Sequence, residues 1–244
     1  VPITGRKQTL LVSDEQVLSL SNQQYEEYMK SAKASTNATN TAMVKRVGQN
    51  LANAVVSYLN ANGMQNDVQN YKWQFNLVAD KQANAWCMPG GLIVVYEGLL
   101  PITQDEASLA IVLGHEIAHA VARHSAEQMS TQIKQQYGIQ GVGALASVLG
   151  VGTNTISLGQ AMASAGLNLA NLKYSRNHES EADYMGLIFA AMAGYNPEAA
   201  VTFWQRMASA STSNTSEFLS DHPSDATRIK NIQGWLPEAK KYYL

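Results

Sequence analysis

The stretch LGHEIAHAVARH, residues 113–124, constrains the fold more than any other part of the chain. His115, Glu116 and His119 stand in the spacing HExxH, on a segment whose other residues are mostly apolar. Successive residues turn by about 100° around an α-helix, so these three side chains share one narrow arc. Burying them against a core is costly unless something pairs with them. We therefore predict a core-facing helix that presents a metal-binding face.

Two histidines one turn apart can direct a ring nitrogen at the same ion, about 2.0–2.1 Å away, and the carboxylate between them can reach a water on that ion. The alternative is an ordinary helix, because the five-residue pattern also occurs by chance. His124 lies about 140° around the helix from His119, facing away from such an ion. We interpret it as a surface or second-layer residue.

A third ligand has to come from elsewhere in the chain, because a catalytic zinc site usually has three protein ligands. Cys87 is the only cysteine, which excludes a cysteine-based zinc site. Glu127 lies too far along the same helix to reach the ion, and the next acidic residue is Glu179. Glu179 and Asp183 are four residues apart, so one could bind the ion while the other accepts a hydrogen bond from a ligand histidine. Alternatively, they only form the acidic start of a helix.

Two stretches with strand character precede the metal helix. The segment YKWQFNLVAD (71–80) alternates apolar and polar residues, as strands do. The segment NAWCMPGGLIVVYEGLL (84–100) is interrupted by Pro89, Gly90 and Gly91 before a β-branched run continues it. We expect a small antiparallel sheet beside the metal helix, with the last strand near the edge of the sheet.

Helical patterns cover much of the remaining chain. Periodic apolar residues predict helices at 14–34 and 40–62, and another helix that ends at Gly194. Thr103 and Glu106 have the spacing of a capping box ahead of the metal helix. The expected fold class is therefore α+β and mostly helical.

Length and charge narrow the class of protein further. With 244 residues, a single domain over 1–244 is the expectation. The formal net charge of −2 provides no basic stripe, which argues against nucleic acid as a main partner. The longest weakly polar run, 141–152, is shorter than the roughly 20 residues that a transmembrane helix needs. We therefore expect no transmembrane segment.

Residues 135–172 contain no charged residue and no histidine, but seven glycines. We expect a helical hairpin packed on the core; the alternative is a lid over the site, or a segment that rests on a membrane surface or a partner. The single domain is then expected to have four parts: N-terminal helices 1–65, sheet and metal helix 70–134, the uncharged segment 135–172, and the remaining helices 173–244.

Four segments together resemble the M48 metallopeptidases of the gluzincin class. They are residues 84–100, residues 113–125, YSRNHESEADYMGLIFAAMAGYNP (174–197) and DHPSDATRI (221–229). In that order they resemble the family's edge strand, metal helix, third-ligand helix and C-terminal loop. The resemblance implies a zincin-like fold and one Zn²⁺ per chain, although the ligand types alone would also accept cobalt or manganese.

The resemblance also implies roles for individual residues. The implied zinc ligands are His115, His119 and Glu179. Glu116 would be the general base, Asp183 would hold a ligand histidine, and Arg176 would have a structural or site-orienting role.

The activity that this implies is endopeptidase cleavage of extended or unfolded proteins. The peptide is expected to lie as an added strand along 92–96, held by main-chain hydrogen bonds. The predicted substrate-binding residues are Gly90, Gly91, Leu92, Ile93 and Val94. One rival is a zinc-containing chaperone-like module that holds unfolded proteins, with little or latent proteolytic activity. The other is a zinc hydrolase that acts on something other than peptides.

His222 precedes Pro223 and matches the family's HP position. Three interpretations stay open: a catalytic donor that stabilises an oxyanion, a removable fourth zinc ligand that keeps the enzyme latent, or a surface histidine.

The expected location is the bacterial cell envelope, because the resemblance is to compact soluble members of the family that are typically exported. The start VPITGRKQ, without an initiator methionine, fits an exported and processed form, periplasmic and possibly with a lipid anchor upstream. The sequence does not indicate an oligomeric state.

Overall fold

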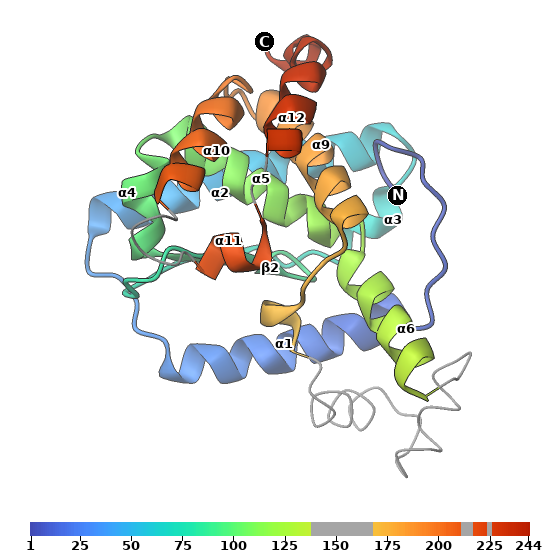
Figure 1. Ribbon diagram of the computed structural model, residues 1–244. Coiled ribbons are helices and arrows are strands. Elements are labelled where there is room, and N and C mark those ends of the chain that lie inside the picture. Colours follow the sequence, from blue (N-terminus) through green and yellow to red (C-terminus); the bar gives the residue numbers. More distant parts are fainter. Residues whose placement is uncertain (138–167, 211–216, 224–225) are drawn as a thin grey trace.

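The computed structural model describes residues 1–137, 168–210, 217–223 and 226–244. Its centre is a three-stranded sheet with helices on both faces (Figure 1). The elements, in chain order, are α1 Asp14–Ser31, α2 Ala38–Ala61, α3 Gln65–Val68, β1 Gln74–Val78, β2 Ala85–Met88, β3 Leu92–Tyr96, η1 Glu97–Leu99, α4 Leu100–Thr103, α5 Glu106–Val121, α6 His124–Tyr137, η2 Leu169–Asn171, α9 Arg176–Met192, α10 Ala199–Ala210, α11 Glu217–Asp221, α12 Ala226–Ala239 and η3 Lys240–Tyr242. The mostly helical α+β fold is confirmed.

The sheet differs from the prediction in two respects. Its strand order is β1-β3-β2, with β1 parallel and β2 antiparallel to β3, so the sheet is mixed rather than antiparallel. The strand β3 lies in the middle, and the prediction that it lies near the edge is wrong. Its continuous apolar run is the pattern of a strand that is covered on both faces, not of an edge strand.

Helices cover both faces of β3. Ile93 and Val95 pack into the core shared with α2 and α5, whereas Leu92 and Val94 pack with residues of α1 and α6. Figure 1 shows this layering, with α1 below the sheet and α2 and α5 above it. All four side chains are buried as a result.

Gly90 and Gly91 form the turn between β2 and β3. Their φ angles are +95° and +84°, a region that side chains other than glycine rarely adopt. A Cβ atom at Gly91 would also come within 2.5 Å of the Trp73 ring. Both glycines are thus explained by the turn. The predicted substrate segment 90–94 offers no free strand edge, because β1 and β2 occupy both sides of β3.

The metal helix α5 forms as predicted, but its N-terminal cap is a different residue. Thr103 belongs to the short α4, and Asp105 is the N-cap, with its side chain accepting a 2.7 Å hydrogen bond from the backbone N–H of Ser108. The carboxylate also lies at the positive end of the helix dipole.

The two helices that carry the predicted ligands cross at a pair of glycines. A Cβ atom at Gly186 of α9 would lie 2.6 Å from the backbone nitrogen of His115, and one at Gly114 of α5 would lie 2.8 Å from the carbonyl oxygen of Gly186. The backbones therefore approach more closely than any side chain would allow. This close crossing brings α9 within reach of the histidines on α5.

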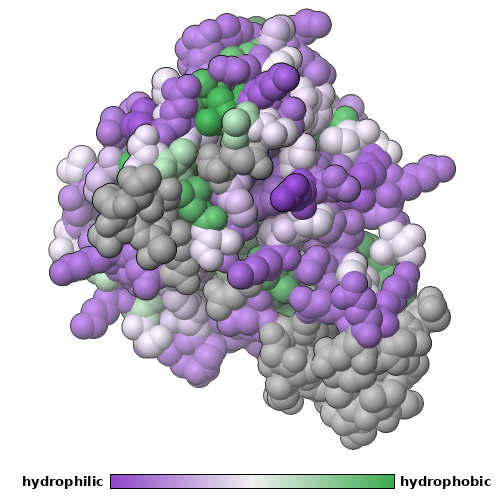
Figure 2. Space-filling model, in the orientation of Figure 1, coloured by the Kyte–Doolittle hydropathy of each residue, from purple (hydrophilic) through white to green (hydrophobic). Residues whose placement is uncertain are grey.

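The predicted hairpin or lid at 135–172 lies mostly outside the described residues. No helix in the described part of the chain combines the length and the hydropathy that a bilayer crossing demands. On the face drawn in Figure 2, the coloured residues form a mainly hydrophilic surface with small apolar patches. Among the described residues, the exposed large hydrophobic side chains are the C-terminal Tyr242, Tyr243 and Leu244.

Candidate functional site

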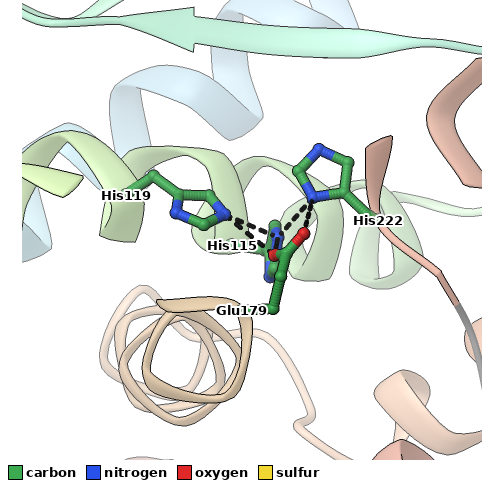
Figure 3. Close-up of side chains that lie close together, drawn as sticks. All are labelled: His115, His119, Glu179 and His222. Atoms are coloured by element: carbon green, nitrogen blue, oxygen red, sulfur yellow. Dashed lines mark hydrogen bonds and ion pairs between the residues drawn. The ribbon is translucent and has the colours of Figure 1, made fainter. Parts of the chain in front are cut away.

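Four buried side chains from three parts of the chain meet between α5 and α9 (Figure 3). His115 and His119 come from α5, Glu179 from the first turn of α9, and His222 from the loop after α11. Their exposed fractions are 2%, 1%, 7% and 5%. One ligand atom from each lies within 4.8 Å of all the others. The three predicted zinc ligands are thus neighbours, and His222 joins them.

The spacing of these atoms fits a metal ion. Nε2 of His115 and Nε2 of His119 are 3.1 Å apart, and Glu179 Oε2 lies 2.9 and 3.0 Å from them. The Nδ1 of His222 is 3.1 Å from Nε2 of His115. Two ligand atoms on one tetrahedral zinc ion are about 3.3 Å apart, since each bond is about 2.0–2.1 Å long. The cluster could therefore hold an ion with only small shifts.

Asp183 and Arg228 hold the ring of His115. The Nδ1 of His115 lies 2.8 Å from Asp183 Oδ1, so it donates there and leaves Nε2 with a free lone pair toward the cluster. Arg228 of α12 donates to the same carboxylate oxygen at 2.6 Å, and its guanidinium lies 3.7 Å above the Trp204 ring. This arginine fills the orienting role that the sequence analysis gave to Arg176.

Arg176 itself is exposed at the start of α9 and forms no ion pair with another described residue. It lines a cleft that opens beside Glu179, together with Tyr174 and Arg228. Its structural or site-orienting role stays a prediction.

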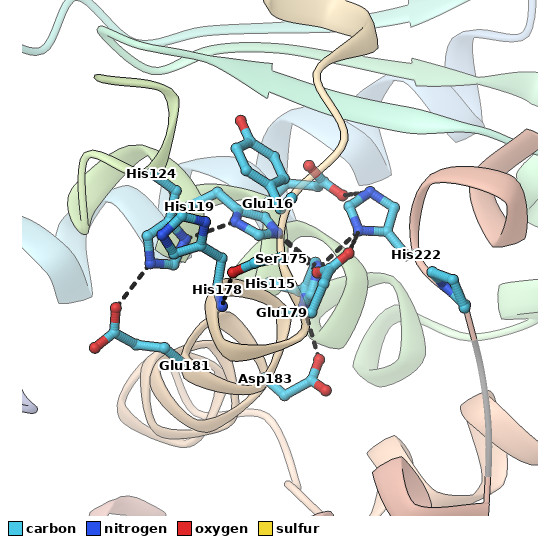
Figure 4. A network of polar contacts seen from close by, with 12 residues as sticks. His115, Glu116, His119, His124, Ser175, His178, Glu179, Glu181, Asp183 and His222 are labelled. Atoms are coloured by element: carbon cyan, nitrogen blue, oxygen red, sulfur yellow. Dashed lines mark hydrogen bonds and ion pairs between the residues drawn. The ribbon is translucent and has the colours of Figure 1, made fainter. Parts of the chain in front are cut away.

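His124 is fully buried and lies against His119, so the second-layer interpretation is confirmed and the surface one is wrong (Figure 4). The predicted direction of His124 is wrong because α5 ends at Val121. Arg123 then takes a left-handed φ of 56°, and α6 begins in a new direction at His124. Two ion pairs from Arg123, to Asp14 and Asp67, stabilise this unusual backbone.

Glu116 lies beside the cluster and faces His222. One carboxylate oxygen is 2.9 Å from Nε2 of His222, but this buried oxygen accepts no hydrogen bond of good geometry. A general base needs such an oxygen to take the proton of a water. The third interpretation of His222, a surface histidine, is wrong, because its ring bridges Glu116 and Glu179 in the interior.

Burial and neighbouring charges shift the pKa values of the cluster residues. Burial opposes a positive charge on His222, but Glu116 and Glu179 raise the pKa of its ring to about 10. Burial lowers the pKa of His119 well below its usual value. Against the effect of burial, the surrounding histidines keep the pKa of Glu179 far below its usual value. Glu179 is therefore ionised and His119 neutral, the states that ligation requires.

Tyr174 and Glu116 are both packed closely around the cluster in this structure. The ring of Tyr174 stacks on His119 with centroids 4.1 Å apart, and its hydroxyl group lies 2.9 Å from the Ser125 hydroxyl. Glu116 is only 4% exposed. Tyr174 therefore covers one side of the cluster.

The sequence patterns indicated neither Arg228 nor Tyr174 as a site residue, and they predicted His124 only as a surface or second-layer residue. Arg228 is 45 residues from Asp183 in the sequence, and no local spacing links the two. Tyr174 immediately precedes the N-cap of the third-ligand helix, and that position was the only available signal.

Comparison with known proteins gives a consistent set of matches. The model of the family "Peptidase family M48" matches residues 25–236. Mitochondrial metalloendopeptidase OMA1 of Schizosaccharomyces pombe is 38% identical over 69% of this chain and 48% of its own length. Metalloendopeptidase OMA1 of Homo sapiens is 29% identical over 98% of this chain and 46% of its own. Metalloprotease LoiP of Escherichia coli is 28% identical over 93% of this chain and 82% of its own. The chain spans about half the length of the OMA1 relatives.

Proposed function

This chain belongs to peptidase family M48, and from that premise we propose that it is a zinc-dependent endopeptidase of extended or unfolded proteins. The observation that carries the proposal is the meeting of His115, His119 and Glu179 in one buried cluster, with the carboxylate of Glu116 beside it. Three protein ligands and an open fourth position are the usual composition of a catalytic zinc site.

Each residue then has a defined task. A zinc ion in the cluster would acidify a bound water and polarise the scissile carbonyl. Glu116 accepts a proton from water and returns it to the leaving amine. Asp183 and Arg228 keep the ring of His115 in one tautomer and one direction. Tyr174, stacked on His119, shields this side of the cluster from bulk water.

The substrate strand is better assigned to β2 than to β3. The strand β2 runs beside α5, and no strand of the described residues pairs with its outer side. The corresponding outer side of β1 is partly covered, because Ala34 forms a bridge with Val78. A peptide added to β2 would be bound through its main chain, with little dependence on its sequence. The short η2 packs near this strand and would have to move aside.

We assign latency to His222. Its ring fills the fourth side of the ligand cluster and contacts Glu116, the two places that water and substrate need. Ligation of an ion by Nδ1 requires loss of the proton at that atom.

We expect His222→Ala to raise the rate of peptide cleavage. If closed molecules dominate, the open form is roughly a tenth of the population or less, so kcat/KM should rise at least about tenfold. The measurement is cleavage of an unfolded protein at matched zinc content. A sharp loss of cleavage with zinc still bound would contradict latency and assign His222 to the catalytic donors.

A role in envelope protein quality control is part of the proposal. Bacterial relatives include the beta-barrel assembly-enhancing protease of Escherichia coli, which is 28% identical over 73% of this chain. Other relatives carry mitochondrial names, so family membership alone is compatible with more than one location. We propose export and a lipid anchor as part of this role.

Metal content and proteolysis test the proposal together. We expect about one zinc per chain, measured by mass spectrometry on protein purified without added metal, and cleavage of casein that chelation abolishes and zinc restores. Glu179→Ala should lose most of the zinc, because it removes one of three ligands. Glu198→Ala is the control, since that glutamate lies exposed and pairs only with Lys240 among the charged residues described. A folded wild-type protein that contains no zinc and does not bind added zinc would overturn the proposal.

A further inference from the structure

His119 has a polar partner on the side away from the cluster. Its Nδ1 lies 2.7 Å from Nδ1 of His124, and Nε2 of His124 lies 2.7 Å from Glu181 Oε1. His124 is 0% exposed, so water cannot replace either contact. The three side chains form a continuous chain that starts on α9 and ends at the candidate metal ligand (Figure 4).

The donors and acceptors of this chain can be assigned in order. An ionised carboxylate only accepts hydrogen bonds, so Nε2 of His124 carries the proton that Glu181 accepts. In a neutral imidazole the other nitrogen then has a lone pair. That lone pair, on Nδ1 of His124, accepts from Nδ1–H of His119. Nε2 of His119 is left with its own lone pair, and this is the atom that faces His115 and Glu179.

We propose that His124 and Glu181 are positioning residues that fix the tautomer and the ring direction of His119. We call the hydrogen-bonded chain Glu181–His124–His119 the relay, and we propose that Arg6 holds its Glu181 end. The inference rests on the proposed zinc site and adds to it the residues that prepare its second histidine. Asp183 does the same for His115, so each ligand histidine of α5 has a separate support from α9.

Arg6 reaches the relay from the N-terminal segment, which runs along the outside of α6 and α9 (Figure 1). Its guanidinium donates to Glu181 at 2.9 and 2.8 Å and to Glu127 at 2.5 Å. Thr4 donates to Glu181 at 3.0 Å. These contacts hold Glu181 in its ionised form and fix its direction. Residues near the start of the chain thereby support a metal ligand more than 100 positions away.

The same region could instead be considered as a second metal site. His124, Glu127 and His178 offer ligand atoms within 4.8 Å of one another. Arg6 argues against a cation there, because its positive charge already lies against Glu127 and Glu181. Both histidines also pair directly with carboxylates: Nε2 of His124 lies 2.7 Å from Glu181, and Nε2 of His178 lies 2.9 Å from Glu127. We therefore favour the relay.

Zinc affinity, measured by competition with a chelator, tests the relay. His124→Phe keeps the ring volume and removes the acceptor, and we expect zinc binding to weaken roughly 10–100-fold, the usual effect of losing a partner of a ligand. His124→Asn should restore most of the affinity, because its Oδ1 takes the position of the lost Nδ1. Arg6→Met should weaken binding by a smaller factor, since Thr4 still contacts Glu181.

His178→Phe is the matched control. His178 stacks on His124 with ring centroids 4.5 Å apart and pairs with Glu127, but none of its contacts with described residues joins it directly to His119. Zinc affinity should stay within about threefold of the wild type. Thermal unfolding of the zinc-free proteins separates a folding defect from an effect on the ligand. If His124→Phe does not fold, Glu181→Gln replaces it as the test variant, and weakened zinc binding is again expected.

Three results would overturn the relay: unchanged affinity in His124→Phe, no recovery in His124→Asn, or two zinc ions per chain with one lost in His178→Phe. An unchanged affinity in Arg6→Met would remove the N-terminal part of the proposal. Failure of the proposed function gives a different result. A wild-type protein that binds zinc and cleaves no protein would contradict the function, but the zinc affinity of each variant could still be compared with it.

Discussion

Glu116→Gln should retain zinc and lose nearly all peptide cleavage, a fall in kcat of about 100- to 10,000-fold, the range that a general base contributes. Glutamine has the shape of glutamate but cannot take a proton from water at neutral pH. Glu116 is not among the four residues that supply ligand atoms to the cluster, so the metal should remain. The measurement is casein cleavage, with zinc content determined on the same samples.

Glu106→Gln provides the matched control for this variant. It is the same substitution on the same helix, at its first residue, where Glu106 forms an ion pair with Arg46 at the surface. Its activity should remain within about twofold of the wild type, because exposed ion pairs contribute little to stability. If Glu116→Gln cleaved casein at a rate comparable to the wild type, Glu116 would not be the base. That result would favour the chaperone-like module.

Much of the site could be predicted because its residues lie in two local patterns. His115 and His119 share one helical face through their spacing of four, and Glu179 and Asp183 do the same on a second helix. Each pattern limits where its side chains can point, whatever the rest of the fold is. The structure brings the two faces together around one cluster.

Other parts depended on the path of the chain and could not be predicted from local patterns. The position of β3 in the sheet follows from its parallel pairing with β1, which is separated from it in sequence by β2. The direction of His124 follows from the left-handed Arg123, at a position where no glycine signals a break. The contact between Arg228 and Asp183 follows from the packing of α12 on α9. In the first and third cases the decisive contact joins segments that are distant in the sequence.

Gly186→Ala should both destabilise the protein and weaken its zinc binding, because it acts where α5 and α9 cross. The new Cβ atom would meet the backbone of Gly114 and His115 at 2.6–2.8 Å, and backbone cannot rotate away as a side chain can. Overpacking of this kind costs about 1–3 kcal/mol, occasionally more. For a chain of this size we expect the melting temperature of the zinc-free protein to fall by roughly 2–12 °C.

The coupling to zinc distinguishes this crossing from ordinary core packing. Pushing the helices apart moves Glu179 away from both histidines, so zinc affinity should fall along with stability. Gly234→Ala is the control: Gly234 lies inside α12 with nothing within 4 Å of the added Cβ, and alanine there should stabilise the helix by up to about 1 kcal/mol. If Gly186→Ala lowered the melting temperature but left zinc affinity unchanged, the distance between α5 and α9 would not set the geometry of the ligands.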